Sequence, residues 1–352
     1  MSTVNENASL VVNERASLIP SWRSNPAVRL LISNAGMLLG LVLLSAFFAV
    51  NSSAFLTTSN MLNVLRQISI NAIIALGMTF VLLTGGIDLS VGSIVAASGS
   101  LMVSMLASLG IPLWQGVLIG LGLGALLGLI NGLVIARGNL PPFIVTLAML
   151  TIARGLAYVY TDGRPTRYDD PAFSAIGNGY IGPVPIPVAI TLVWFVICVI
   201  LLYRTRFGRH VYAIGGNLEA ARFSGIKIPE VITLVYVISG FAAGLSGVIL
   251  AARMSSGQPI AGQGFELDAI AAIVLGGTSL AGGKGKLSGT LIGALIIGVL
   301  NNGLNLMQVS FYYQLIIKGL VIVGAVYLDT VSGKVSLATL RKRFTGNRAV
   351  TG

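Results

Sequence analysis

Residues 113–136 read LWQGVLIGLGLGALLGLINGLVIA and contain no charged side chain. The stretch is longer than the roughly 20 apolar residues that a helix needs to cross the hydrocarbon core of a bilayer. A helix also satisfies its own backbone hydrogen bonds, which is a condition for crossing lipid. The stretch therefore predicts a transmembrane helix, and similar stretches recur along the chain.

The composition of the whole chain agrees with this prediction. Hydrophobic residues make up 55% of its 352 residues and charged residues 9%, whereas soluble domains are about a quarter charged. The apolar runs are long and continuous, unlike the short alternating strands of a membrane barrel. We expect an all-α polytopic transmembrane helical bundle of about ten spans. They lie at about 30–50, 62–84, 91–109, 113–136, 142–161, 184–203, 230–252, 266–281, 287–305 and 311–329, and the short eighth span is tilted, re-entrant or broken.

Basic residues are divided unevenly between the two sides of such a bundle. If the chain starts inside and crosses ten times, most of its 22 Lys and Arg residues fall on inner segments, as the positive-inside rule requires. Membrane topology thus accounts for the net charge of +11, and no nucleic-acid partner is expected. We expect a disordered cytoplasmic N-terminal tail (1–28), a transmembrane domain (29–330) and a basic C-terminal tail (331–352), with both termini cytoplasmic.

Glycines recur every four residues within 113–136 and form one nearly continuous helix face. Such a face lets a second helix approach backbone to backbone. Gly240 and Gly244 repeat the spacing, and so do Gly289 and Gly293. We expect tight helix packing at these faces, with sliding between them as the alternative. The glycines of the first face are Gly116, Gly120, Gly124, Gly128 and Gly132.

One short segment recurs later in the chain. Residues 84–97 align with residues 281–294 without a gap, and both segments join two expected spans on the inner side. The match is either an internal repeat or a coincidence in a glycine-rich chain. The identical pairs are Gly85 and Gly282, Gly86 and Gly283, Gly92 and Gly289, and Ala97 and Ala294.

Residues that carry enzyme or metal chemistry are scarce. The one cysteine, Cys198, lies in an apolar run, and the one histidine, His210, lies in a basic loop. They provide neither a zinc site nor a catalytic triad. Gly283-Lys284 lacks the preceding glycine and the following Ser or Thr of a P-loop. We predict no catalytic, metal or cofactor-binding residue, so a process driven by Mg-ATP needs a separate ATPase subunit.

Polar side chains near or inside the spans are costly in lipid and therefore indicate specific roles. Asp88, in the inner turn GGIDLSVGS, either caps the third span or takes part in gating or an ion pair. Glu266 and Asp268 begin the eighth span and have the same two interpretations at the outer face. Arg154 and Lys318 either snorkel to the headgroups or form buried ion pairs. Four asparagines either line a polar path or bond neighbouring helices: Asn71, Asn131, Asn301 and Asn302.

The inner loop at 204–229 is the longest on that side and contains most of GRHVYAIGGNLEAARFSGIKIPE. Asn217 is a good N-cap, and Glu219 lies in the first turn of the helix expected at 218–224. Gly225 suits the left-handed position that ends a helix, and Pro229 prevents its continuation. Such a short helix is marginal in water. It is therefore held by a partner protein or rests on lipid headgroups.

Several segments of this sequence resemble one family of transporters. EAARFSG at 219–225 is similar to the EAAxxxG coupling motif of the membrane subunits of ATP-binding cassette (ABC) importers. The stretches LLTGGIDLSVGSIVAASG (82–99), TIARGLAYVYTDGRP (151–165) and FELDAIAAIVLGGTSLAGGKGKLSGTLIGALI (265–296) resemble its ribose, xylose and galactose permeases. The resemblance spans roughly residues 60–330, and its long GG-rich blocks are specific when taken together.

The resemblance implies a complex in the plasma (inner) membrane. Two permease subunits, identical or related, form the pathway, two ATPase subunits lie in the cytoplasm, and an external binding protein delivers a sugar. The implied docking helix, which fits a cleft on the ATPase, carries Asn217, Glu219, Ala220, Ala221, Arg222 and Gly225.

Other functions remain open at this stage. Importers of branched-chain amino acids or nucleosides share glycine-rich features with the sugar permeases. A self-contained secondary transporter needs intramembrane ion sites, which the sequence does not show clearly. A scaffold has little use for polar residues inside spans. A membrane enzyme is least favoured, because no acid pair, metal cluster or nucleophile lies in the spans.

Overall fold

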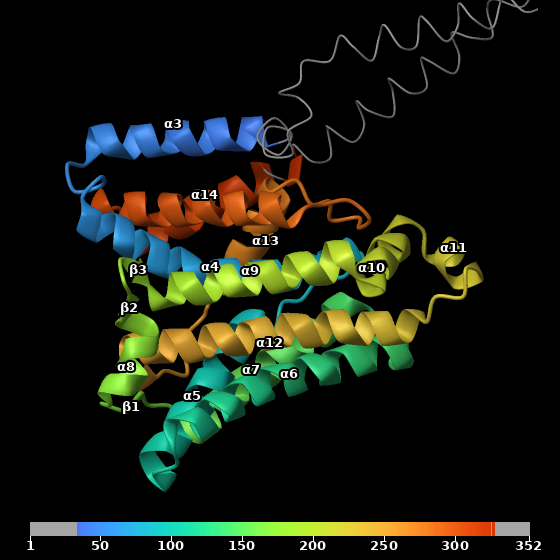
Figure 1. The fold of residues 1–352 in the computed structure, drawn as a ribbon, viewed down its shortest axis with the longest axis horizontal. Coiled ribbons are helices and arrows are strands. Elements are labelled where there is room, and N and C mark those ends of the chain that lie inside the picture. The colour runs from blue at the N-terminus through green and yellow to red at the C-terminus, as the bar shows by residue number, and fades with distance from the viewer. Residues whose placement is uncertain (1–33, 325, 328–352) are drawn as a thin grey trace, which may run out of the picture.

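The computed structural model describes residues 34–324, 326 and 327, so the expected tails at 1–28 and 331–352 lie outside the described residues. The described part is helical with a few two-residue strands (Figure 1). Its elements are α3 (Ala35–Asn51), α4 (Thr58–Leu83), α5 (Val91–Leu109), α6 (Leu113–Gly138), α7 (Pro142–Thr161), β1 (Thr166–Arg167), α8 (Pro171–Asn178), β2 (Tyr180–Ile181), β3 (Val184–Pro185), α9 (Ile186–Arg204), α10 (Arg206–Gly216), α11 (Leu218–Phe223), α12 (Ile228–Met254), β4 (Ser256–Gly257), α13 (Phe265–Leu275) and α14 (Leu287–Leu306). A further helix spans Phe311–Gly324.

Seven of these helices are long and apolar enough to cross a membrane: α4, α5, α6, α7, α9, α12 and α14. Two shorter apolar helices, α3 and Phe311–Gly324, lie where the first and last spans were expected. The expectation of a helical membrane bundle is therefore confirmed. Most helix boundaries fall within a few residues of the expected spans.

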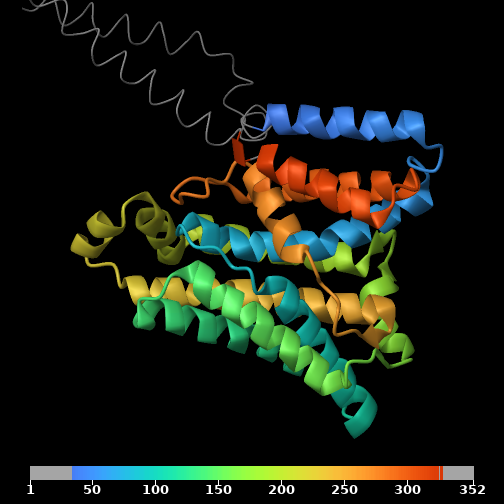
Figure 2. The same cartoon turned by 180° about the vertical axis from the view of Figure 1, so that it is seen from behind.

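The long helices run side by side and form a layered bundle (Figures 1 and 2). α3 lies at one edge against α14, and α14 packs on α4 and α13. α12 is central, because it contacts α4, α5 and α6. One end of the bundle carries α8 and the short strands, with β1 paired to β4 and β2 paired to β3. α10 and α11 project from the opposite end, which we call the α11 end.

The glycine face of α6 packs against α12, as the sequence predicts. All five glycines of the face are buried. A methyl group added to Gly124 would overlap Gly240 and Gly244 of α12, and one added to Gly128 would overlap the backbone of Tyr236. Two faces with glycine every fourth residue therefore let the helix backbones touch, which side chains on either face would prevent.

The helix in the place of the expected eighth span is shorter than predicted. α13 begins at Phe265, after an irregular segment at 258–264, and ends at Leu275 rather than at the predicted residue 281. The helix stops there because Gly277 adopts a left-handed φ of 77°, a conformation that glycine adopts without steric cost. Residues 276–286 then form a turn that leads into α14.

The two matching segments found in the sequence also lie together in space. Gly85 and Gly282 have almost the same left-handed φ, 81° and 84°. The backbone N–H of Gly283 donates to the carbonyl of Leu83 at 2.9 Å, so the turn after α13 touches the end of α4. The internal similarity thus corresponds to two helix–turn–helix units that meet at their turns.

Candidate functional site

The end caps of α11 are those that the sequence predicts. The side chain of Asn217 accepts a hydrogen bond from the backbone N–H of Ala220 at 2.9 Å. Gly225 has a φ of 75°, its N–H donates to the carbonyl of Arg222, and the N–H of Ile226 donates to that of Ala221. This pair of bonds closes the C-terminus of the helix in a Schellman motif. A six-residue helix is therefore fixed at both ends.

The exposed face of α11 mixes charge with one large apolar side chain. Glu219 and Arg222 form an ion pair at 3.4 Å, and their side chains are 62% and 65% exposed. Ala221 is buried, whereas Phe223 is 87% exposed. The sequence analysis did not single out Phe223. Its place inside the EAARFSG segment at 219–225, between Arg222 and the terminating Gly225, was the available signal.

The sequence analysis also missed α10, which precedes α11. The hydroxyl of Thr205 caps this helix by accepting from the N–H of Gly208 at 3.3 Å. Val211 and Ile214 are buried, and Phe207 packs on the same core. The spacing of these three residues (i, i+4, i+7) is the apolar periodicity of a helix and could have revealed it. α11 packs mainly on α10, so α10 is its link to the bundle.

A cavity of about 520 Å³ lies beneath these helices at the α11 end. Its wall comes from the turn at 84–86, the connection between α6 and α7, and the segment from α10 to the start of α12. Arg222 and Lys227 line it, and so does Tyr236 of α12. The connection between α11 and the bundle is therefore a loosely filled region rather than a continuous core.

Asp88 lies near this cavity and is completely buried. Its carboxylate accepts hydrogen bonds from the backbone N–H and the hydroxyl of Ser90 and from the hydroxyl of Ser239. Asn131 donates to the Ser90 hydroxyl at 2.9 Å. Among the described residues, no cation forms an ion pair with Asp88. Asp88 and its hydrogen-bond partners therefore fit a structural role in the turn before α5 rather than an ion pair. They tie the start of α5 to α6 and α12.

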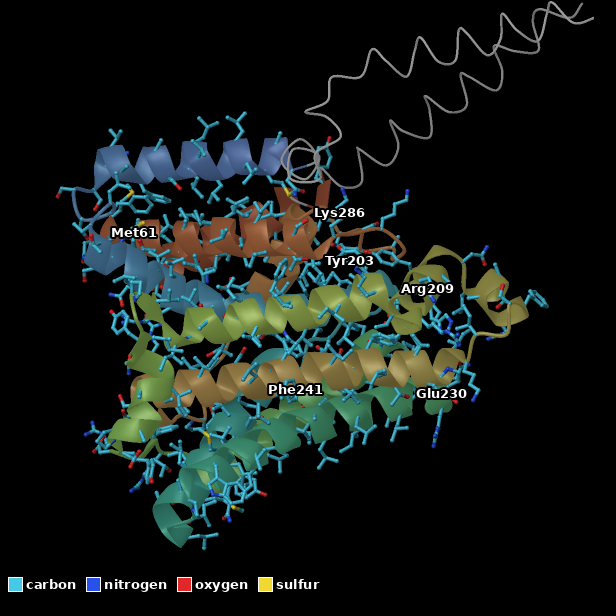
Figure 3. All side chains as sticks on the ribbon, in the orientation of Figure 1. Met61, Tyr203, Arg209, Glu230, Phe241 and Lys286 are labelled. Atoms are coloured by element: carbon cyan, nitrogen blue, oxygen red, sulfur yellow. The ribbon has the colours of Figure 1, made fainter. Side chains whose placement is uncertain are left out.

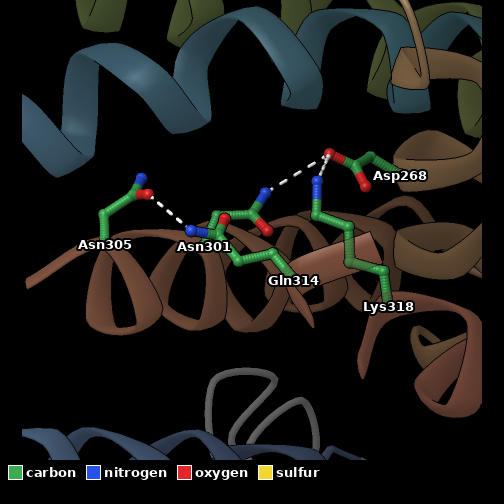
Figure 4. A network of polar contacts seen from close by, with 5 residues as sticks. All are labelled: Asp268, Asn301, Asn305, Gln314 and Lys318. Atoms are coloured by element: carbon green, nitrogen blue, oxygen red, sulfur yellow. Dashed lines mark hydrogen bonds and ion pairs between the residues drawn. The ribbon is translucent and has the colours of Figure 1, made fainter. Parts of the chain in front are cut away.

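Lys318 forms a buried ion pair with Asp268, which the sequence did not identify as its partner (Figure 4). The Lys318 Nζ atom lies 3.1 Å from Asp268 Oδ2, and the Asn301 side-chain amide donates to the same oxygen at 3.3 Å. Asp268 is 5% exposed, so its carboxylate is buried between the helices. The network joins α13, α14 and the helix Phe311–Gly324.

The remaining candidates lie apart from these two groups. Asn302 exchanges hydrogen bonds with Asn60 of α4 at 2.9 and 3.0 Å. The buried Asn71 has a side-chain oxygen without a hydrogen-bond partner among the described residues. Glu266 lies against Gly92, at the start of α5. The polar residues therefore pair locally between helices and do not converge on one site.

Arg154 forms no ion pair among the described residues. Its guanidinium donates to the backbone carbonyls of Pro259 and Ala261 at 2.6 and 2.7 Å. These residues belong to the irregular segment before α13, whose carbonyls lack helical partners. Arg154 thus stabilises the irregular segment at 258–264, which precedes α13. Within the described residues, no group of three or more His, Cys, Asp or Glu side chains could hold a metal ion.

Curated relatives cover most of the chain at high identity. The ribose import permease protein of Bacillus subtilis (strain 168) is 51% identical over 299 residues, which are 84% of this chain and 92% of that protein. The ribose import permease protein of Escherichia coli (strain K12) is 48% identical over 296 residues, 83% and 92% of the two chains. The D-allose transport system permease protein of the same strain is 40% identical over 293 residues, 83% and 90%. No solved structure matches.

A family model also matches the chain, over residues 60–326. Its description is "branched-chain amino acid transport system / permease component". The matched region contains α11, the Asp88 group, the Asp268 network and all seven long apolar helices. The chain therefore belongs to this family of transport-system permease components, as multi-pass membrane proteins.

Proposed function

We propose that the chain is the permease subunit of an ABC importer for a monosaccharide of the ribose class. It forms the translocation pathway in the plasma (inner) membrane with a second permease copy, identical or related. An external binding protein delivers the sugar, and two copies of a cytoplasmic ATPase subunit hydrolyse Mg-ATP. The observation that carries this proposal is the 48–51% identity to ribose import permeases over more than four fifths of the chain.

The geometry of α11 supports the ATPase as a partner. The helix is fixed by caps at both ends, projects from the bundle and exposes Glu219, Arg222 and Phe223. An isolated helix of this length gains little from its own hydrogen bonds. Its rigid caps and exposed aromatic side chain fit a surface that a partner protein covers. We propose that α11 docks into a cleft on the ATPase.

The proposal includes the topology and the roles of the buried polar groups. The chain crosses the membrane ten times, with α13 as the eighth crossing, and both termini are cytoplasmic. The α11 end then faces the cytoplasm. Asp88 and Asn131 hold the start of α5 against α6 and α12, while Asp268 and Asn301 hold α13. These contacts join elements that have to move together when the pathway opens to one side.

A pull-down from native membranes tests the assembly directly. The tagged chain is solubilised in a mild detergent, and the co-purifying proteins are identified and quantified. We expect a cytoplasmic ATPase at one copy per permease chain. A chain that purifies without ATPase, with and without nucleotide, would instead favour a self-contained transporter whose α11 rests on lipid.

The family description names branched-chain amino acids, so this substrate class has to be tested beside sugars. The sugar reading is favoured because the relatives at 40–51% identity carry ribose and D-allose in their names. Uptake by the reconstituted importer, measured with radiolabelled ribose, leucine and adenosine in parallel, separates the sugar from the amino acid and from the nucleoside alternative. Transport of leucine or adenosine without ribose would contradict the monosaccharide assignment.

A further inference from the structure

Two tyrosine hydroxyls, one from α10 and one from the end of α9, contact the turn at 276–286 and the start of α14. The Tyr212 hydroxyl donates to the carbonyl of Gly285 at 2.8 Å. The hydroxyl of Tyr203, at the end of α9, accepts from the N–H of Leu287 at 3.1 Å, where α14 begins. Figure 3 labels Tyr203 and Lys286 near the α11 end. The Tyr212 hydroxyl is protonated at neutral pH even at the ordinary tyrosine pKa of about 10, and burial raises its pKa further.

The same helix meets this turn a second time, through its backbone. Gly215 of α10 lies so close to the Leu83 carbonyl and the Gly283 N–H that an added methyl group would overlap both. Leu83 and Gly283 are themselves hydrogen-bonded at 2.9 Å. α10 is therefore held against the end of α4 and the turn after α13 by contacts that leave no room for adjustment.

The turn at 276–286 is itself rigidly connected to α13 and α14, the two helices that it joins. A methyl group added to Gly289 of α14 would overlap the Gly276 carbonyl, and one added to Gly293 would overlap that of Ala272. α13 and α14 thus pack backbone on backbone. The Asp268–Lys318 pair and the Asn301 bond fix the same two helices to each other and to the next one. A displacement of the turn therefore moves α13 and α14 as one unit.

We propose that Tyr212 and Gly215 are positioning residues that transmit the movement of α11 to the α13–α14 unit. The route runs from α11 to α10, from α10 to the turn at 276–286, and from the turn to α13 and α14. This inference rests on the proposed function, because it takes the movement of α11 to be caused by an ATPase that is docked on it. It adds the residues through which the movement of α11 reaches the helices inside the membrane.

The first test removes the Tyr212 hydroxyl and keeps its ring. The complete importer, with its ATPase and binding protein, is reconstituted in proteoliposomes with either wild type or Tyr212→Phe. The readout is the number of sugar molecules imported per ATP hydrolysed. We expect this ratio to fall about fivefold, the effect of losing one net hydrogen bond, while ATPase co-purification and hydrolysis stay near wild type. Tyr160→Phe, an exposed tyrosine at the far end of α7, is the control and should leave the ratio unchanged.

The second test uses two neighbouring glycines of α10 with different surroundings. Gly215→Ala places a methyl group against Leu83 and Gly283, whereas Gly216→Ala places one where no atom lies within 4 Å. We expect Gly215→Ala to lower the ratio and Gly216→Ala to leave it at the wild-type value. Thermal unfolding of both purified variants establishes that each is folded.

The outcomes separate the inference from the proposed function. If wild type imports no sugar at the expense of ATP, the proposed function fails. If wild type couples the two and neither Tyr212→Phe nor Gly215→Ala changes the ratio, the transmission route is wrong. Loss of ATPase co-purification in Tyr212→Phe would also overturn it, because the residue would then act in docking and not in transmission.

Discussion

At the scale of single residues, the buried charges in this protein are held in two different ways. Asp88 relies on hydrogen bonds from two serines and a backbone N–H, whereas Asp268 has a cationic partner in Lys318. A buried charge without such compensation costs several kcal/mol. The sequence revealed both carboxylates but not how each is compensated, because Ser239 and Lys318 are distant in the chain and neighbours only after folding.

Replacing Asp88 by Asn should destabilise the protein by about 1–3 kcal/mol. An amide has one acceptor oxygen and one NH₂ group, so the Ser239 hydroxyl, which donates to Oδ2, would have to turn and accept from the NH₂ group, and the charge-assisted hydrogen bonds to the carboxylate would be lost. The measurement is thermal unfolding of the purified chain in detergent, where a lower Tm is expected. Asp162→Asn is the matched control, because Asp162 is exposed and its φ of 50° suits asparagine. Equal melting of Asp88→Asn and wild type would contradict this account.

Lys318→Met should destabilise the protein by about 3–5 kcal/mol, since it leaves Asp268 buried without its partner. The double variant Lys318→Met with Asp268→Asn removes both charges and should recover much of the loss. Thermal unfolding of Lys318→Met, of Asp268→Asn and of the double variant completes this double-mutant cycle. If the losses of the single variants simply add in the double variant, the ion pair seen at 3.1 Å contributes nothing to stability.

At the scale of elements, the sequence predicted what depends on local chemistry. The glycine face of α6 and the caps of α11 follow from residues close together in the chain, and both are confirmed. How the irregular segment at 258–264 is held in place before α13 was not predicted. It depends on Arg154 of α7, which binds the carbonyls of Pro259 and Ala261 about a hundred positions later. Such a contact has no local signature.

Gly225→Val should uncouple ATP hydrolysis from transport while leaving expression intact. A β-branched residue is strongly disfavoured at a φ of 75°, so the end of α11 would have to rearrange. Sugar uptake in cells that lack the native gene measures the effect. Gly155→Val is the control, because Gly155 of α7 has open space around it and no positive φ. Equal uptake by Gly225→Val and wild type would contradict the coupling role assigned to this end of α11.

Phe223→Ala should weaken the association with the ATPase more than the loss of either charged neighbour. Burying a Phe side chain contributes about 1.5–3 kcal/mol, whereas an exposed ion pair such as Glu219–Arg222 contributes about 0–1 kcal/mol. The ATPase retained in a pull-down at rising detergent concentration gives the comparison. Phe311→Ala, which changes an exposed aromatic residue outside α10 and α11, serves as the control. Undiminished ATPase retention by Phe223→Ala would exclude this side chain from the interface.

At the scale of the whole molecule, the proposed topology assigns each end of the bundle to one side of the membrane. The α11 end carries the docking helix and faces the cytoplasm, and the α8 end faces outward. Seven long helices are present in the described residues, and the ten crossings depend in addition on α3, α13 and Phe311–Gly324. The positive-inside rule predicts the orientation from the sequence alone, because charge placement is a property of the loops and not of the packing.

Accessibility of engineered cysteines tests this orientation in intact cells. The single native cysteine, Cys198, is buried in α9 and can be replaced by serine to give a background without thiols. In that background Ser224→Cys, beside α11, should react with a membrane-impermeant maleimide only after the cells are opened. Ala172→Cys, in α8, should react from outside, and both positions are exposed. The reverse pattern would place α11 outside, where no ATP-hydrolysing partner could reach it, and would refute the importer together with its topology.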